Sequence, residues 1–171
     1  MTVSTFTIDC NKCSRLADYL ADSKVKYPDY YCKPVPPFGD PNSQLLIVGL
    51  APGLHGANAT ARPFTGDHAG IILYQTLYKF GFANQAQSRA LDDGLVLLNA
   101  RITNAFKCVP PQHKPTSAEV RTCNLYLQEE INVLVGPHVI LALGRIAHES
   151  IVRALGLRHK DFTFAHGAVH T

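Results

Sequence analysis

The sequence is poor in charged residues and has no long apolar run. Only 17% of its 171 residues are charged and 46% are hydrophobic, a balance that excludes a disordered chain and a coiled coil. The longest apolar runs, such as 45–50 and 139–143, are far shorter than the roughly 20 residues of a membrane-spanning helix. The first residues, Met1-Thr2-Val3-Ser4, lack the basic segment and apolar stretch of a secretory signal. We therefore expect a soluble, cytoplasmic protein with one domain.

The sequence also lacks a charge excess and an even set of cysteines. Its net charge is +3, which is compatible with nucleic acid binding but does not indicate it. The five cysteines are Cys10, Cys13, Cys32, Cys108 and Cys123. An odd number without a secretory signal argues against a disulfide framework, and the Cys10-x-x-Cys13 pair points to a metal site instead.

Apolar blocks that alternate with helical patterns predict an α/β fold. Runs at 44–50, 95–106 and 139–143 are typical of strands buried on both faces, and a fourth short strand is expected around Phe162 and Phe164. We expect a single domain over 1–171, with a central, mostly parallel four-stranded sheet and helices on both faces.

Four segments have helical patterns: 9–24, 73–80, 117–134 and 144–155. Asp9 is the expected N-cap of the first, which would place Cys10 and Cys13 on one helical face. Thr116 and Glu119 form a capping box before the third, whose apolar face includes Cys123.

Four of the cysteines are candidates for a shared metal site. Thiolates at Cys10, Cys13, Cys108 and Cys123 could bind zinc or an iron–sulfur cluster. Zinc ribbons usually repeat the short Cys-x-x-Cys element, and the second pair does not, which favours a cluster over zinc. Inert buried thiols would also explain these residues. Cys32 is left over and is interpreted as a bystander.

A glycine-rich loop, Gly49-Leu50-Ala51-Pro52-Gly53-Leu54-His55-Gly56, follows the first expected strand. Ligands of open parallel sheets bind at the carboxyl ends of strands, so this loop is a candidate binding site. Its glycine spacing matches neither a dinucleotide fingerprint nor a Walker loop. A tight turn would explain the glycines as well, and a lone histidine is more often structural than catalytic.

Phe64 and Asn104 are further candidates near the same sheet edge. Phe64, between proline and glycine, could offer an aromatic face in a pocket or anchor the core. Asn104 ends the second expected strand, and its amide could read the paired donor and acceptor of a pyrimidine edge. It could equally satisfy a loop backbone.

Together these motifs resemble the uracil-DNA glycosylase superfamily, in particular its iron–sulfur families 4 and 5. The resemblance rests on Cys10-x-x-Cys13, the 49–56 loop, Arg62-Pro63-Phe64-Thr65-Gly66-Asp67, Thr103-Asn104-Ala105-Phe106-Lys107-Cys108-Val109-Pro110-Pro111, and Leu143-Gly144. The Leu-Ala-Pro-Gly-x-His-Gly-x-Asn form of the loop is most like family 5, the type B enzymes.

The resemblance implies a role for each matching residue. The four cysteines would hold a structural 4Fe–4S cluster, Phe64 would stack on a flipped base, and Asn104 would hydrogen-bond uracil. Ala51 stands where other families have a water-activating Asp, and Asn58 matches a polar position that handles water. Catalytic residues would be His55, Asn58 and Asn104, and substrate-binding residues Gly49, Ala51, Pro52, Gly53, Phe64 and Asn104.

The implied function is excision of uracil, with other deaminated bases as further candidates, from DNA by a monomer that contacts no membrane. Two departures stand out. Ala59 and Ala61 replace the family's usual Arg and Gly, and no His-Pro-Ser-x-x-Asn segment follows His166. The domain is thus expected to lack a C-terminal strand and the second catalytic loop. A non-catalytic DNA- or base-binding relative, or an iron–sulfur α/β redox or nucleotide-binding protein, are the alternatives.

Overall fold

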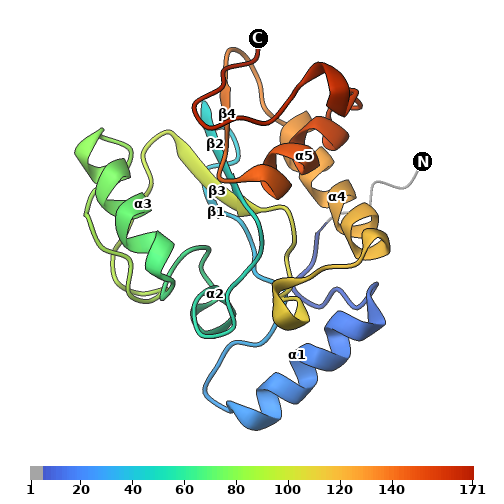
Figure 1. Ribbon diagram of the computed structural model, residues 1–171. Helices are drawn as coiled ribbons and strands as arrows, with labels where there is room; N and C mark the ends of the chain where they lie inside the picture. The colour runs from blue at the N-terminus through green and yellow to red at the C-terminus, as the bar shows by residue number, and fades with distance from the viewer. Residues whose placement is uncertain (1–5) are drawn as a thin grey trace.

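A four-stranded sheet lies at the centre of the structure, a computed structural model that describes residues 6–171 (Figure 1). The strands are β1 (Phe38–Gly39), β2 (Leu45–Gly49), β3 (Ala100–Asn104) and β4 (Val139–Ala142), in the order β1-β3-β2-β4. Strand β2 pairs in parallel with β3 and β4, whereas β1 runs antiparallel to β3. The predicted mostly parallel sheet is confirmed. The prediction for Met1–Ser4 lies outside the described residues.

Helices cover both faces of this sheet, as predicted. They are α1 (Ser14–Lys26), α2 (Ala57–Thr60), α3 (His68–Lys79), α4 (Ser117–Asn132) and α5 (Arg145–Ala154). One core cluster joins β2 to α4 and α5, and the other joins β2 and β3 to α3 and the chain that follows it. Figure 1 shows α3 on one side of the sheet and α4 with α5 on the other. None of the helices in the described part of the chain is long and apolar enough to span a membrane.

The fourth strand is not where the sequence analysis placed it. Phe162 and Phe164 follow a short 3-10 turn and belong to no strand, so that prediction was wrong. Strand β1 comes instead from the proline-rich stretch before β2, directly after Pro36 and Pro37. An edge strand tolerates prolines at its start, because only one of its sides needs ladder hydrogen bonds.

Strand β4 also differs from the prediction of a strand buried on both faces. Among the described residues it pairs with β2 alone, and Val139 and Leu141 are 62% and 43% exposed. Strand β3 is shorter than predicted, because residues 95–99 leave the sheet and Leu97 forms a bridge with Ala83.

Helix α1 begins later than predicted. Cys13 occupies its N-cap position, and Asp9 lies in a turn that precedes it. Cys10 is therefore outside the helix, and the predicted single helical face for Cys10 and Cys13 was wrong. The capping box of α4 is confirmed, because the Thr116 side chain accepts from the Glu119 N–H and the Glu119 carboxylate from the Thr116 N–H.

Candidate active site and thiol cavity

Phe64 and Asn104 meet over the carboxyl end of β2. Gly49 ends β2 opposite Asn104, which ends β3. A Cβ atom built on Gly49 would overlap the ring tip of Phe64 and would lie 2.5 Å from Asn104 Oδ1. The ring and the amide therefore converge on a backbone that has no side chain. Three of the predicted site residues, far apart in sequence, are brought together here.

The amide oxygen of Asn104 has no internal partner. Asn104 is 4% exposed, and its buried Oδ1 accepts no hydrogen bond within residues 6–171. A buried acceptor without a donor costs about 1–3 kcal/mol of stability. Such groups are few in folded proteins, and a ligand that donates to the oxygen removes the cost.

Gly53 and Gly56 of the 49–56 loop lie against Asp67 and also close a tight turn, in which the Gly56 N–H donates to Gly53 O. A Cβ on either Gly53 or Gly56 would overlap the Asp67 carboxylate, so this loop must lie against it with bare backbone. The Ala57 N–H donates to Asp67 Oδ2 at 3.3 Å. Burial raises the pKa of Asp67, although hydrogen bonds from the Ala57 and Gly53 N–H groups oppose this rise. The sequence assigned Asp67 no role of its own, because only the folded chain brings its carboxylate onto the glycines.

His55 lies on the exposed outer side of this loop. Its Nδ1 forms a hydrogen bond of 2.9 Å with the Tyr30 hydroxyl, and its ring is edge-on to Tyr27, which stacks on Tyr30. The hydrogen bond fixes the orientation of the imidazole and leaves Nε2 for another partner. The two tyrosines were not predicted, since they come from the irregular segment after α1.

Asn58 is completely buried beneath the loop. Its Nδ2 donates to Leu54 O at 3.4 Å and to Cys32 Sγ at 3.5 Å, and its buried Oδ1 has no partner in the described part of the chain. The Cys32 N–H also donates to Asn58 O. Cys32 thus packs against a candidate catalytic residue, and the role of Asn58 stays a prediction. Ala51 is half-buried and Pro52 is buried in the same loop.

A cavity of about 590 Å³ opens beside Phe64, between α3 and the chain that follows it. Its walls include Asp67 and His68 at the start of α3, with Gln87, Ser88 and Arg89 opposite. The cavity gives the Phe64 region a concave surface of mixed character, more apolar than polar, that is open to solvent.

Four cysteines line a second, smaller cavity. Cys10, Cys13, Cys108 and Cys123 are brought together there from three distant segments, with Lys107 and Tyr126. Cys10 Sγ lies 3.1 Å from the Tyr126 hydroxyl, and Cys123 Sγ accepts the Lys107 N–H at 3.4 Å. Cys32 is not part of this wall. The four residues that the sequence analysis grouped as candidate ligands therefore share one site.

The environment of these thiols disfavours their ionisation. Burial, with smaller contributions from the neighbouring Cys13 and Cys10, raises the pKa of Cys123 to about 11, although the N–H and the charge of Lys107 oppose the rise. Burial and the other three cysteines raise the pKa of Cys108 as well. Thiolates here need a cationic partner. Within residues 6–171, no group of three or more Cys, His, Asp or Glu side chains is arranged to hold a metal ion.

Lys107 joins the two sites. Its side chain is 2% exposed, and its Nζ donates to the Asn104 carbonyl at 3.1 Å and forms an ion pair with Glu130. Its own N–H reaches Cys123. One residue thus holds the segment from Asn104 to Cys108 both beside Asn104 and beside the thiol cavity.

Comparison with known proteins shows the family of the chain. The family model of the uracil DNA glycosylase superfamily matches residues 36–170. The chain is 40% identical over 171 residues to the type-5 uracil-DNA glycosylase of Thermus thermophilus, covering 97% of this chain and 77% of that protein. It is 39% identical to the type-5 uracil-DNA glycosylase of Pyrobaculum aerophilum (95% and 72% covered) and 29% identical to the type-4 enzyme of Archaeoglobus fulgidus (95% and 68% covered). The chain therefore belongs to the uracil DNA glycosylase superfamily.

Proposed function

We propose that this protein removes uracil from DNA by hydrolysing the bond between the base and its deoxyribose. The observation that carries the proposal is the pairing, over Gly49, of an aromatic ring with an unpartnered buried amide oxygen. A base turned out of the duplex would stack on Phe64 and place its edge against Asn104. The relatives named type-5 uracil-DNA glycosylase support the choice of uracil.

The Asn104 amide suits uracil chemically. Uracil has a donor at N3 and an acceptor at O4, so Oδ1 would accept from N3 and Nδ2 would donate to O4. As the glycosidic bond breaks, negative charge spreads over the uracil ring and onto O4. The Nδ2 donor therefore binds the departing base more strongly than the intact nucleotide, which lowers the barrier.

The attacking water has only weak bases near it in this proposal. Residue 51 is alanine, so the 49–56 loop offers no carboxylate at that position. We assign His55 and Asn58 as the polar residues of the loop region that orient the attacking water. An amide orients water but does not deprotonate it. Stabilisation of the leaving base and of the cationic sugar would then supply most of the rate enhancement.

We also propose that Cys10, Cys13, Cys108 and Cys123 hold a 4Fe–4S cluster. The four cysteines line one cavity, and the lack of a second Cys-x-x-Cys pair favours a cluster over zinc. When bound, the cluster would supply the positive charge that keeps the sulfurs ionised and would tie the N-terminal segment to α4. The reaction itself would involve the chain's own residues.

The test is single-turnover excision from oligonucleotides that contain one uracil, opposite guanine, opposite adenine or unpaired. Release of uracil and an alkali-labile site, abolished with Phe64→Ala combined with Asn104→Ala, is the expected result. Binding of uracil DNA without release would favour the non-catalytic alternative. Neither binding nor release, with a cluster that cycles between two redox states, would favour the redox alternative. The monomeric state and cytoplasmic location expected from the sequence stay predictions.

A further inference from the structure

The segment between α3 and β3 forms hydrogen bonds with the residues on both sides of Phe64. We propose that Arg62, Ser88 and Asp93 form a clasp that positions the Phe64 ring for base stacking. Asp93 and Ser88 would act through Phe64 as positioning residues, without touching the substrate. This inference rests on the proposed function of Phe64 and adds residues from a loop that the site motifs do not include.

The backbone around Phe64 is strained. Phe64 has φ +60° and Ala61 has φ +64°, so two residues with side chains occupy the left-handed region within one short segment. A non-glycine residue in this region is disfavoured and persists only where its surroundings hold it in place. Something outside 61–64 must therefore supply the restraint.

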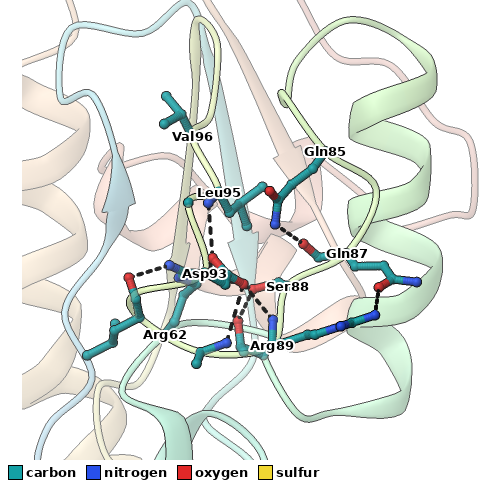
Figure 2. Close-up of polar contacts among 12 residues, drawn as sticks. Arg62, Gln85, Gln87, Ser88, Arg89, Asp93, Leu95 and Val96 are labelled. Carbon is teal, nitrogen blue, oxygen red and sulfur yellow. Dashed lines mark hydrogen bonds and ion pairs between the residues drawn. The ribbon is translucent and has the colours of Figure 1, made fainter.

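Arg62 supplies the first part of that restraint. It is 2% exposed, and its Nη1 donates to Asp93 Oδ1 at 2.9 Å and to Ser88 Oγ at 3.0 Å. Its Nη2 donates to Leu91 O at 3.0 Å, and its guanidinium lies 4.5 Å from the ring centre of Phe38. Figure 2 shows Arg62 facing Asp93 and Ser88 across this network. A buried guanidinium with these partners has one position available.

Asp93 holds the loop that faces Arg62 in place. Its carboxylate accepts the Arg89 N–H at 2.7 Å and the Leu95 N–H at 3.0 Å, in addition to Arg62 (Figure 2). Its side chain is 11% exposed. The carboxylate thus organises the irregular loop that carries Ser88 and then presents that loop to Arg62.

The neighbours of Phe64 are held individually. The Thr65 hydroxyl lies 2.6 Å from Ser88 Oγ, and the Tyr74 hydroxyl of α3 donates to Pro63 O at 2.6 Å. On the other side, Gly70 lies so close to the Phe64 carbonyl that a Cβ there would overlap it. Residues 62, 63 and 65 are each held by hydrogen bonds to side chains elsewhere in the fold. These contacts fix the backbone on both sides of Phe64 and so direct its ring toward Gly49.

A double-mutant cycle tests this inference. Asp93→Asn keeps the shape but removes the charge that pairs with Arg62, and we expect uracil excision to fall about tenfold in the parent background. With Phe64→Ala already present, the same change should alter the rate less than twofold, because no ring is left to position. Ser88→Ala is the milder companion variant and should follow the same pattern with a smaller effect. Asn124→Ala removes a buried hydrogen bond between α4 and α5 and is the control for general destabilisation.

Equal losses from Asp93→Asn with and without Phe64 would overturn the clasp, as would a loss of the same size in Asn124→Ala. A second readout does not depend on activity. In protein labelled on its eight phenylalanine rings, the ring signals of Phe64, assigned by Phe64→Ala, should shift and broaden in Asp93→Asn and not in Asn124→Ala. Unchanged Phe64 signals in Asp93→Asn would overturn the clasp. If the parent releases no uracil while these signals do shift, the proposed function fails and the clasp stands.

Discussion

Asn104 and Cys108 lie on the same short segment, yet they belong to two sites that are built in opposite ways. The first site, where Phe64 and Asn104 meet over Gly49, needs the absence of side chains. Its glycines give room to the Phe64 ring and to the Asn104 and Asp67 side chains. The thiol cavity needs four particular side chains from distant parts of the chain. A change at the first site should therefore affect recognition and leave the fold intact. A change at the second should release the N-terminal segment and α4 from each other.

The largest expected effect lies on the thiol side. Cys108→Ser should remove the bound iron, about four atoms per chain in the parent, and lower the free energy of unfolding by about 3 kcal/mol or more. For a chain of this size, the melting temperature would fall by about 6–12 °C. Iron and sulfide analysis with thermal unfolding would measure both.

Cys32→Ser is the matched control for that experiment. Cys32 is also buried but lies against Asn58, away from the thiol cavity, and serine keeps a hydrogen-bond acceptor there. The Cys32→Ser variant should therefore bind as much iron as the parent. One zinc per chain and no iron in the parent would contradict the proposed cluster, and loss of iron in both variants would contradict the assignment of ligands.

Asn104→Asp should produce the next largest effect, and it should act on the rate of uracil excision, not on iron content or stability. The substitution replaces the donor that faces uracil O4 with an acceptor, so one buried pair becomes repulsive at a cost of about 2–3 kcal/mol. Uracil excision should slow by about 30- to 160-fold, while the iron content stays that of the parent. Single-turnover kinetics on U·G and U·A duplexes measure this. A variant as fast as the parent would remove Asn104 from base recognition.

The sequence predicted the local features of both sites better than their surroundings. The capping box at Thr116 and the strand that ends at Asn104 are set by short patterns, and both were found. Strand β1 was missed because two residues with prolines before them carry no periodic pattern. Asp67, Tyr30 and Asp93 were assigned no role of their own for a different reason. Each acts on a residue that lies near it only in the folded chain, so no spacing could indicate the pair.

The stability that Asp93 gives to the clasp should depend on pH. Burial raises the pKa of Asp93, but the N–H of Arg89, the guanidinium of Arg62 and the N–H groups of Leu95 and Ala90 together hold it well below its ordinary value. A lowered pKa gives stability that is present above the unfolded value, near 4, and is lost as the pH falls below it. The parent should therefore exceed Asp93→Asn by about 1–2 kcal/mol at pH 7, and by less at pH 3. Denaturant unfolding at the two pH values measures the difference. A constant difference would show that the Asp93 charge is not what stabilises the loop.

The smallest expected effect concerns Ala61, where a residue with a side chain ends α2 in the left-handed region. That conformation costs a non-glycine residue about 1–2 kcal/mol, whereas glycine loses about 0.5–1 kcal/mol more entropy on folding. Ala61→Gly should thus stabilise the protein by about 0.5–1 kcal/mol. Because the clasp still holds Arg62, Thr65 and hence Phe64, excision should stay within a factor of about two of the parent. Ala59→Gly, in the interior of α2, is the control and should destabilise by a similar amount, since its backbone is helical. Equal destabilisation by both glycines would mean that the backbone at Ala61 carries no strain, so that Phe64 alone would need an external restraint.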